Sequence, residues 1–181
     1  MGPDRITDQR LFAASPLGEI EVDSLNINLA PPRFVRIAAL YIVGLMQRYS
    51  DATCAQIPMQ WQAFQLHIGH IDKHKGSAAF GVICNRDESG EWDYLTGVRV
   101  KQLSTLPKEL AGILISPQTY AVFRHDGHVS RIRQTCEAIF GQWLPSSPCG
   151  QLNAPWFERY GERFDGHSGQ GDTEIWIPIC R

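Results

Sequence analysis

The stretch from Ala154 to Ile179, APWFERYGERFDGHSGQGDTEIWIPI, indicates two strands joined by a long polar loop. The first expected strand, Trp156 to Phe164, carries Glu158 among aromatic residues, and the second, Thr173 to Ile179, is apolar and β-branched. Side chains alternate between the faces of a strand, so Glu158 and Tyr160 are expected to share one face. A carboxylate is costly to bury among rings unless it is paired, which makes Glu158 a candidate functional residue. The alternative is an ordinary exposed glutamate on an edge strand.

The preceding chain contains the same order of elements twice: strand, helix and hairpin. In the first copy we expect one long strand from Phe34 to Tyr49, bent at Gly44, a helix from Ile57 to Ile71, and a hairpin of strands Ala78 to Cys84 and Glu91 to Val100. In the second copy we expect a strand from Ala111 to His125, interrupted at Ser116-Pro117, and a helix from Ser130 to Leu144, capped by Ser130. The hairpin of the opening stretch completes this copy.

The two copies are offset by about 77 to 79 residues, which predicts a duplicated domain. One strand–helix–strand–strand unit leaves a sheet edge open, and two units related by a pseudo-twofold axis would complete each other. We therefore predict an α+β fold with an antiparallel sheet and a groove between the halves. The expected domain covers residues 33–181, with repeats at about 33–102 and 111–181, after an N-terminal arm of residues 1–32 that has a short alternation able to add an edge strand.

The composition of the 181 residues excludes several classes of function. A formal net charge of -2, without a block of basic residues, argues against direct DNA binding by this chain. No apolar run is long enough to span a membrane, no signal peptide is expected, and five scattered cysteines without a CxxC pair indicate free thiols in a cytoplasmic protein. His67, His70 and His74 could share a helix face, but one helix seldom supplies a complete metal site. We expect neither metal nor cofactor.

Six ordered segments resemble the GyrI-like family, the effector-binding domain of AraC-type and multidrug-sensing regulators. They are GLMQRYS (44–50), IPMQWQAF (57–64), FGVICNRDESGEWDYLTGVRV (80–100), TYAVFRHDGHVS (119–130), EAIFGQWLPSS (137–147), and FERYGERFD with EIWIPI near the C-terminus. The resemblance spans about Phe34 to Ile179. It implies a duplicated α/β domain whose groove binds small, often cationic or amphipathic molecules through aromatics and a central glutamate. The helix-turn-helix of the full regulators has no counterpart in residues 1–32, so a stand-alone form is expected.

The resemblance places the central glutamate at Glu158 and groove aromatics at Tyr94 and Trp176. Tyr160 shares the expected face of Glu158. Tyr41 and Tyr120 lie in equivalent strands that could meet near the pseudo-twofold axis and line the groove. Arg99 stands where an acidic residue is common in the family, and its effect on the groove is undecided. The candidate ligand-binding residues are Glu158, Tyr94, Trp176, Tyr120, Tyr41 and Tyr160.

Three functions fit these residues. The first is a binding module for a lipophilic or cationic small molecule. The second is a hydrolase of cyclopropane-containing natural products, with Glu158 as general base and Tyr94 as donor, which the family resemblance implies. The third is a protein-interaction role of the DNA gyrase-inhibitor type. The sequence leaves the ligand and the oligomeric state open.

Overall fold

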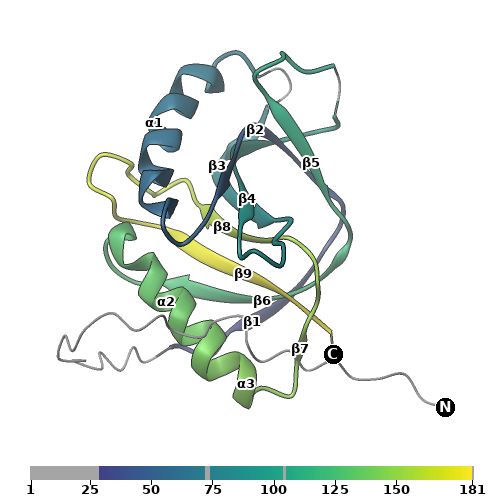
Figure 1. Cartoon of the computed structure of the whole chain (residues 1–181), viewed down its shortest axis with the longest axis vertical. Helices are drawn as coiled ribbons and strands as arrows, with labels where there is room; N and C mark the ends of the chain where they lie inside the picture. Colours follow the sequence, from purple (N-terminus) through teal and green to yellow (C-terminus); the bar gives the residue numbers. More distant parts are fainter. Residues whose placement is uncertain (1–28, 72–73, 104, 181) are drawn as a thin grey trace.

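A computed structural model describes residues 29–71, 74–103 and 105–180, and the expected arm strand lies outside them. The fold is α+β, with a nine-stranded sheet in which every strand pair is antiparallel. The strands are β1 (Arg33–Ile37), β2 (Leu40–Tyr49), β3 (His74–Cys84), β4 (Trp92–Val100), β5 (Ala111–Ile115), β6 (Gln118–His125), β7 (Gly150–Gln151), β8 (Trp156–Tyr160) and β9 (Thr173–Cys180). Their order is β1-β6-β9-β8-β3-β4-β2-β5, and β7 pairs with β9. The strands β8 and β3, far apart in sequence, therefore form the centre of the sheet (Figure 1).

Two helices, α1 (Ile57–Ile68) and α2 (Ile132–Ala138), lie on the same side of the molecule in Figure 1. Both cover one face of the sheet: α1 packs on side chains of β3 and β4, and α2 packs on side chains of β6 and β9. Pro58 lies in the first turn of α1, where its missing N–H costs no hydrogen bond. No helix in the described part of the chain is long and apolar enough to span a membrane.

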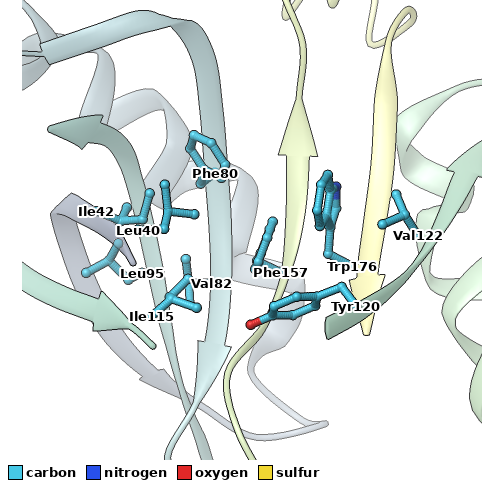
Figure 2. Close-up of a cluster of buried hydrophobic side chains, with 10 residues drawn as sticks. All are labelled: Leu40, Ile42, Phe80, Val82, Leu95, Ile115, Tyr120, Val122, Phe157 and Trp176. Carbon is cyan, nitrogen blue, oxygen red and sulfur yellow. The ribbon is translucent and has the colours of Figure 1, made fainter. Parts of the chain in front are cut away.

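The opposite face of the sheet carries the main apolar cluster, drawn in Figure 2. Aromatic rings hold its centre together: Phe157 stacks on Trp176 with ring centroids 5.2 Å apart, and Tyr120 lies 5.1 Å from Phe157. The cluster comprises Leu40, Ile42, Phe80, Val82, Leu95, Ile115, Tyr120, Val122, Phe157 and Trp176. Because these residues come from both ends of the strand order, the core joins the two halves of the sheet.

The prediction of one long strand from Phe34 to Tyr49 is wrong. This stretch is two strands that lie far apart in the sheet, β1 beside β6 and β2 between β4 and β5. Gly44 is not a bend; it lies within β2, where a Cβ would come within 1.9 Å of the backbone oxygen of Thr96. The interruption expected at Ser116-Pro117 is confirmed, because β5 ends at Ile115 and β6 begins at Gln118.

Both helices differ in detail from the sequence-based expectation. α1 ends at Ile68 instead of Ile71. The second helical segment begins with η2 (Val129–Arg131) and continues through α2, the π-helical η3 (Ile139–Trp143) and α3 (Leu144–Ser146). Its N-cap is His128, whose ring nitrogen accepts a hydrogen bond from the backbone N–H of Ser130, so Ser130 is not the cap. A short 3-10 turn, η1 (Cys54–Gln56), precedes α1.

Candidate functional site

The site lies at the centre of the sheet, on the face that the helices cover. Thr96 of β4, Gly81 of β3 and Glu158 of β8 are direct partners in neighbouring strands, so they form a row across the sheet. Gly81 leaves the middle of this row without a side chain. A Cβ there would lie 2.1 Å from the hydroxyl oxygen of Tyr94 and 2.8 Å from Oε2 of Glu158. Glycine at this position thus makes room for the tyrosine and the carboxylate to meet.

The carboxylate of Glu158 is held by two tyrosines. The hydroxyls of Tyr94 and Tyr160 both donate to Oε2 of Glu158, each at 2.8 Å. The indole N–H of Trp61 donates to the hydroxyl oxygen of Tyr94 at 3.1 Å, and the Trp61 ring lies edge-on to that of Tyr160, with centroids 5.0 Å apart. Hydrogen bonds to a charged acceptor are about twice as strong as neutral ones, so this arrangement suits an ionised carboxylate.

Burial opposes ionisation at the same position. Glu158 is only 8% exposed, and burial raises its pKa above the ordinary 4.5, although the two tyrosine hydroxyls lower it. Burial, and then the charge of Glu158, hold the pKa of Tyr94 and of Tyr160 well above 10.0. No basic side chain among the described residues forms an ion pair with Glu158. The site is therefore a buried acid with hydroxyl donors and without a counter-ion from the described chain.

The two helices cover the site on this face of the sheet. Trp61 lies on α1, and the amide of Gln60 anchors that helix to the sheet by donating to the backbone oxygens of Leu45 and Tyr94. Cys136 lies on α2. It packs on the cluster that contains Ile175, the direct partner of Glu158 in β9, and burial, followed by the charge of Glu158, holds the pKa of its thiol well above 9.0. The site thus lies between the sheet and the two helices.

The structure brings together three of the six candidate ligand-binding residues, Glu158, Tyr94 and Tyr160. Trp176 and Tyr120 lie in the apolar cluster on the opposite face, so they do not meet Glu158 (Figure 2). Trp176 does share a face with Glu174, to which its indole N–H donates at 3.1 Å. The family resemblance predicted Trp176 as a groove aromatic, whereas the sheet register gives Trp176 the face of its partner Phe157, opposite to that of Glu158.

Tyr41 is also separated from Glu158. It is half-buried on β2, four residues from Leu45, the partner of Thr96 in the row that contains Glu158. That spacing corresponds to about 13 Å along the strand, and the strands β4 and β3 lie between β2 and β8. The interpretation of Tyr41 and Tyr120 as neighbours of a central axis is therefore not supported by their positions.

Trp61 is absent from the candidate residues predicted from the sequence. It lies on α1, is only partly buried and contacts both tyrosines of the site. The sequence places Trp61 on the apolar face of a helix. Apolar spacing alone does not distinguish a residue of the core from a residue of a binding site. No group of three or more potential metal-ligating side chains occurs among the described residues, and nothing is described of the His74 side chain.

A family model for the GyrI-like small molecule binding domain matches residues 30–179. The chain belongs to this family. The GyrI-like domain is 28% identical over 149 residues to the transcriptional regulator BrlR of Pseudomonas aeruginosa, a match that covers 81% of this chain and 54% of BrlR. The chain spans about half of the length of that relative. It is thus a small-molecule-binding domain that is similar to a part of a transcriptional regulator.

Solved structures share the fold of this GyrI-like domain. SAV2435, in a structure with tetraphenylphosphonium bound, has a TM-score of 0.69 and 23% identity, covering 83% of this chain and 94% of its own. EcmrR, in a structure with DNA, has a TM-score of 0.61 and 15% identity, covering 86% of this chain and 59% of its own. At these identities the likeness establishes the shared fold.

Proposed function

We propose that this GyrI-like domain binds a lipophilic organic cation, with Glu158 as the counter-ion. The observation that carries the proposal is the carboxylate of Glu158, buried beneath aromatic rings without a basic partner among the described residues. Burying an unpaired carboxylate destabilises the ligand-free domain, because the charge loses its hydration. The attraction of a bound cation would offset this loss of free energy. Tetraphenylphosphonium in the structure of SAV2435 supports a ligand of this class.

Aromatic side chains around Glu158 suit a cation with apolar substituents. Trp61 and Tyr160 present rings that attract a cation by about 0.5–2 kcal/mol each when they lie within reach. In the described structure Trp61 contacts both tyrosines, so a ligand must displace its indole to reach the carboxylate. Ligand entry would therefore break the hydrogen bond between Trp61 and Tyr94, and Trp61 fluorescence is expected to report binding.

We also infer that the domain is the product of a duplication, with repeats at about 33–102 and 111–181. The order of strands supports this, because β3 and β8 at the centre are flanked by β4 and β9, then β2 and β6. Gly81 and Glu158 occupy equivalent positions of the two hairpins, and they also face each other in register. Two facing positions at a pseudo-twofold axis share one space, so only one can carry a large side chain. This supports a single binding site per domain, at Glu158.

Two probes of the same shape and opposite charge test the function. Tetraphenylphosphonium is cationic, and tetraphenylborate is its anionic counterpart. We expect tetraphenylphosphonium to bind, measured by calorimetry and by quenching of tryptophan fluorescence, and tetraphenylborate to bind at least tenfold more weakly. At about 5–6 Å and an effective dielectric constant near 20, a carboxylate attracts a cation by roughly 3 kcal/mol. Equal binding of both probes would refute the assignment of Glu158 as a counter-ion.

The substitution Glu158→Gln keeps the size of the side chain and removes its charge. We expect it to lower the affinity for tetraphenylphosphonium at least tenfold, whereas Glu162→Gln, at an exposed position of the loop after β8, leaves it unchanged. Because a raised pKa leaves part of Glu158 protonated at acidic pH, affinity in wild type should increase as the pH rises through that pKa. Mass spectrometry after incubation separates binding, which leaves the ligand intact, from hydrolysis.

A further inference from the structure

The tyrosine, indole and amide donors next to Glu158 are all used within the protein. The hydroxyls of Tyr94 and Tyr160 donate to Oε2 of Glu158, and the indole of Trp61 donates to Tyr94. The amide nitrogen of Gln60 donates to two backbone oxygens. None of these side chains has a spare donor to offer a ligand without breaking a bond that it already makes.

Three oxygen atoms in the same region accept no hydrogen bond from the described residues. Both tyrosines donate to Oε2, and no described residue donates to Oε1 of Glu158. The side-chain oxygen of Gln60, a residue that is 2% exposed, has no hydrogen-bond partner among the described residues, nor does the hydroxyl of Thr96, which is fully buried. Buried polar atoms are rarely left unpaired in native proteins, so the buried oxygens of Gln60 and Thr96 point to a missing partner in this region.

These three oxygens lie around the same point of the sheet. Thr96 is two residues from Tyr94 on the same strand face and is the direct partner of Gly81, which faces Glu158. Gln60 hydrogen-bonds to the backbone of Tyr94 and of Leu45, and Leu45 is the partner of Thr96 in the adjacent strand pair. The unpaired oxygens of Gln60 and Thr96 therefore belong to the Glu158 site and not to a distant part of the core.

We propose that the ligand of this site is a protonated amine, whose N–H donates to Oε1 of Glu158, in preference to a quaternary cation that has no N–H. The inference rests on the proposed function, since it requires a cation at Glu158. A quaternary cation would satisfy the charge of Glu158 but leave Oε1 without a donor. A primary, secondary or tertiary ammonium satisfies both.

Three ligands that differ only in N-methylation test this preference. Nortriptyline is a secondary amine, amitriptyline a tertiary amine, and N-methylamitriptylinium a quaternary cation, all with the same apolar ring system. Near pH 7 all three carry one positive charge. We expect calorimetry with the full chain to show that the secondary and tertiary amines bind about tenfold more tightly than the quaternary cation, as one lost charge-assisted hydrogen bond requires.

The substitution Glu158→Gln should remove this preference, because an amide oxygen is a weaker acceptor and carries no charge. Glu162→Gln, at an exposed position, should retain it. The series on wild type is decisive without any variant, so the test does not depend on the folding of Glu158→Gln. Binding of the quaternary cation as tightly as the amines would overturn the proposal while leaving the proposed function intact. If none of the three ligands, nor tetraphenylphosphonium, binds to wild type, the proposed function fails as well.

Discussion

Replacing Gly81 by alanine tests the packing around Glu158 with the smallest change. The added Cβ would lie 2.1 Å from the hydroxyl oxygen of Tyr94 and 2.7 Å from the ring carbon that carries it. Tyr94 is 2% exposed, and its hydroxyl is held between Trp61 and Glu158, so it cannot move without breaking hydrogen bonds. Overpacking costs about 1–3 kcal/mol, and a displaced hydrogen bond to a charged acceptor about 1.5–3 kcal/mol.

One effect opposes this loss. Alanine restricts the unfolded chain more than glycine does, which stabilises a compatible site by about 0.4–1 kcal/mol. We therefore expect Gly81→Ala to lower the free energy of unfolding by about 2–4 kcal/mol, a large part of the stability of an ordinary domain. Unfolding in urea, followed by tryptophan fluorescence and extrapolated linearly to water, measures this difference.

A matched control and a double variant make the test specific. Gly141 lies in η3, where an added Cβ would meet no atom within 4 Å outside the backbone of its own helix, so Gly141→Ala should be neutral or stabilising by up to about 1 kcal/mol. Tyr94→Phe removes the oxygen nearest to the added methyl, so the double variant with Gly81→Ala should lose less stability than the two single variants together. Unchanged stability of Gly81→Ala, or additive losses in the double variant, would refute the close contact between Gly81 and Tyr94.

Three further outcomes are expected. Burial raises the pKa of Glu158 above 4.5, so the native state favours the protonated acid; the resulting stabilisation is complete below about pH 4.5 and is lost as the pH rises through the higher folded-state pKa. Urea unfolding across this pH range should show that loss in wild type and not in Glu158→Gln. Tyr94→Phe leaves Glu158 with one donor fewer and the indole of Trp61 without its acceptor, and we expect it to lower the free energy of unfolding by about 1–3 kcal/mol at pH 7; a change no larger than that of a surface variant would contradict the hydrogen bonds. Trp176→Ala should cost about 3–5 kcal/mol through its contact with Phe157, yet leave the affinity of the remaining folded protein for tetraphenylphosphonium unchanged, whereas a specific loss of affinity would place Trp176 in the site.

Local patterns predicted most of the elements because their signals lie within a few residues of each other. The alternation along Trp156 to Tyr160 correctly put Glu158 and Tyr160 on one face, and the apolar spacing of Ile57 to Ile68 identified α1. The long strand from Phe34 to Tyr49 failed for a non-local reason. Its two parts have the same β-forming composition, but β1 pairs with β6 whereas β2 pairs with β4 and β5, and pairing partners are not encoded in local propensity.

The sequence by itself determined the α+β class, the doubled order of elements, the family, and Glu158 as the residue that needs an explanation. Only the tertiary structure decided which aromatic residues meet that carboxylate. Tyr94 reaches it because Gly81, on the strand between them, leaves the space open, and Tyr160 reaches it from the same strand. Trp176, equally aromatic and in the paired strand, faces the opposite side. The physical reason is register: a shift of one residue in strand pairing exchanges the two faces of a sheet, and register is set by contacts between strands that are distant in the chain.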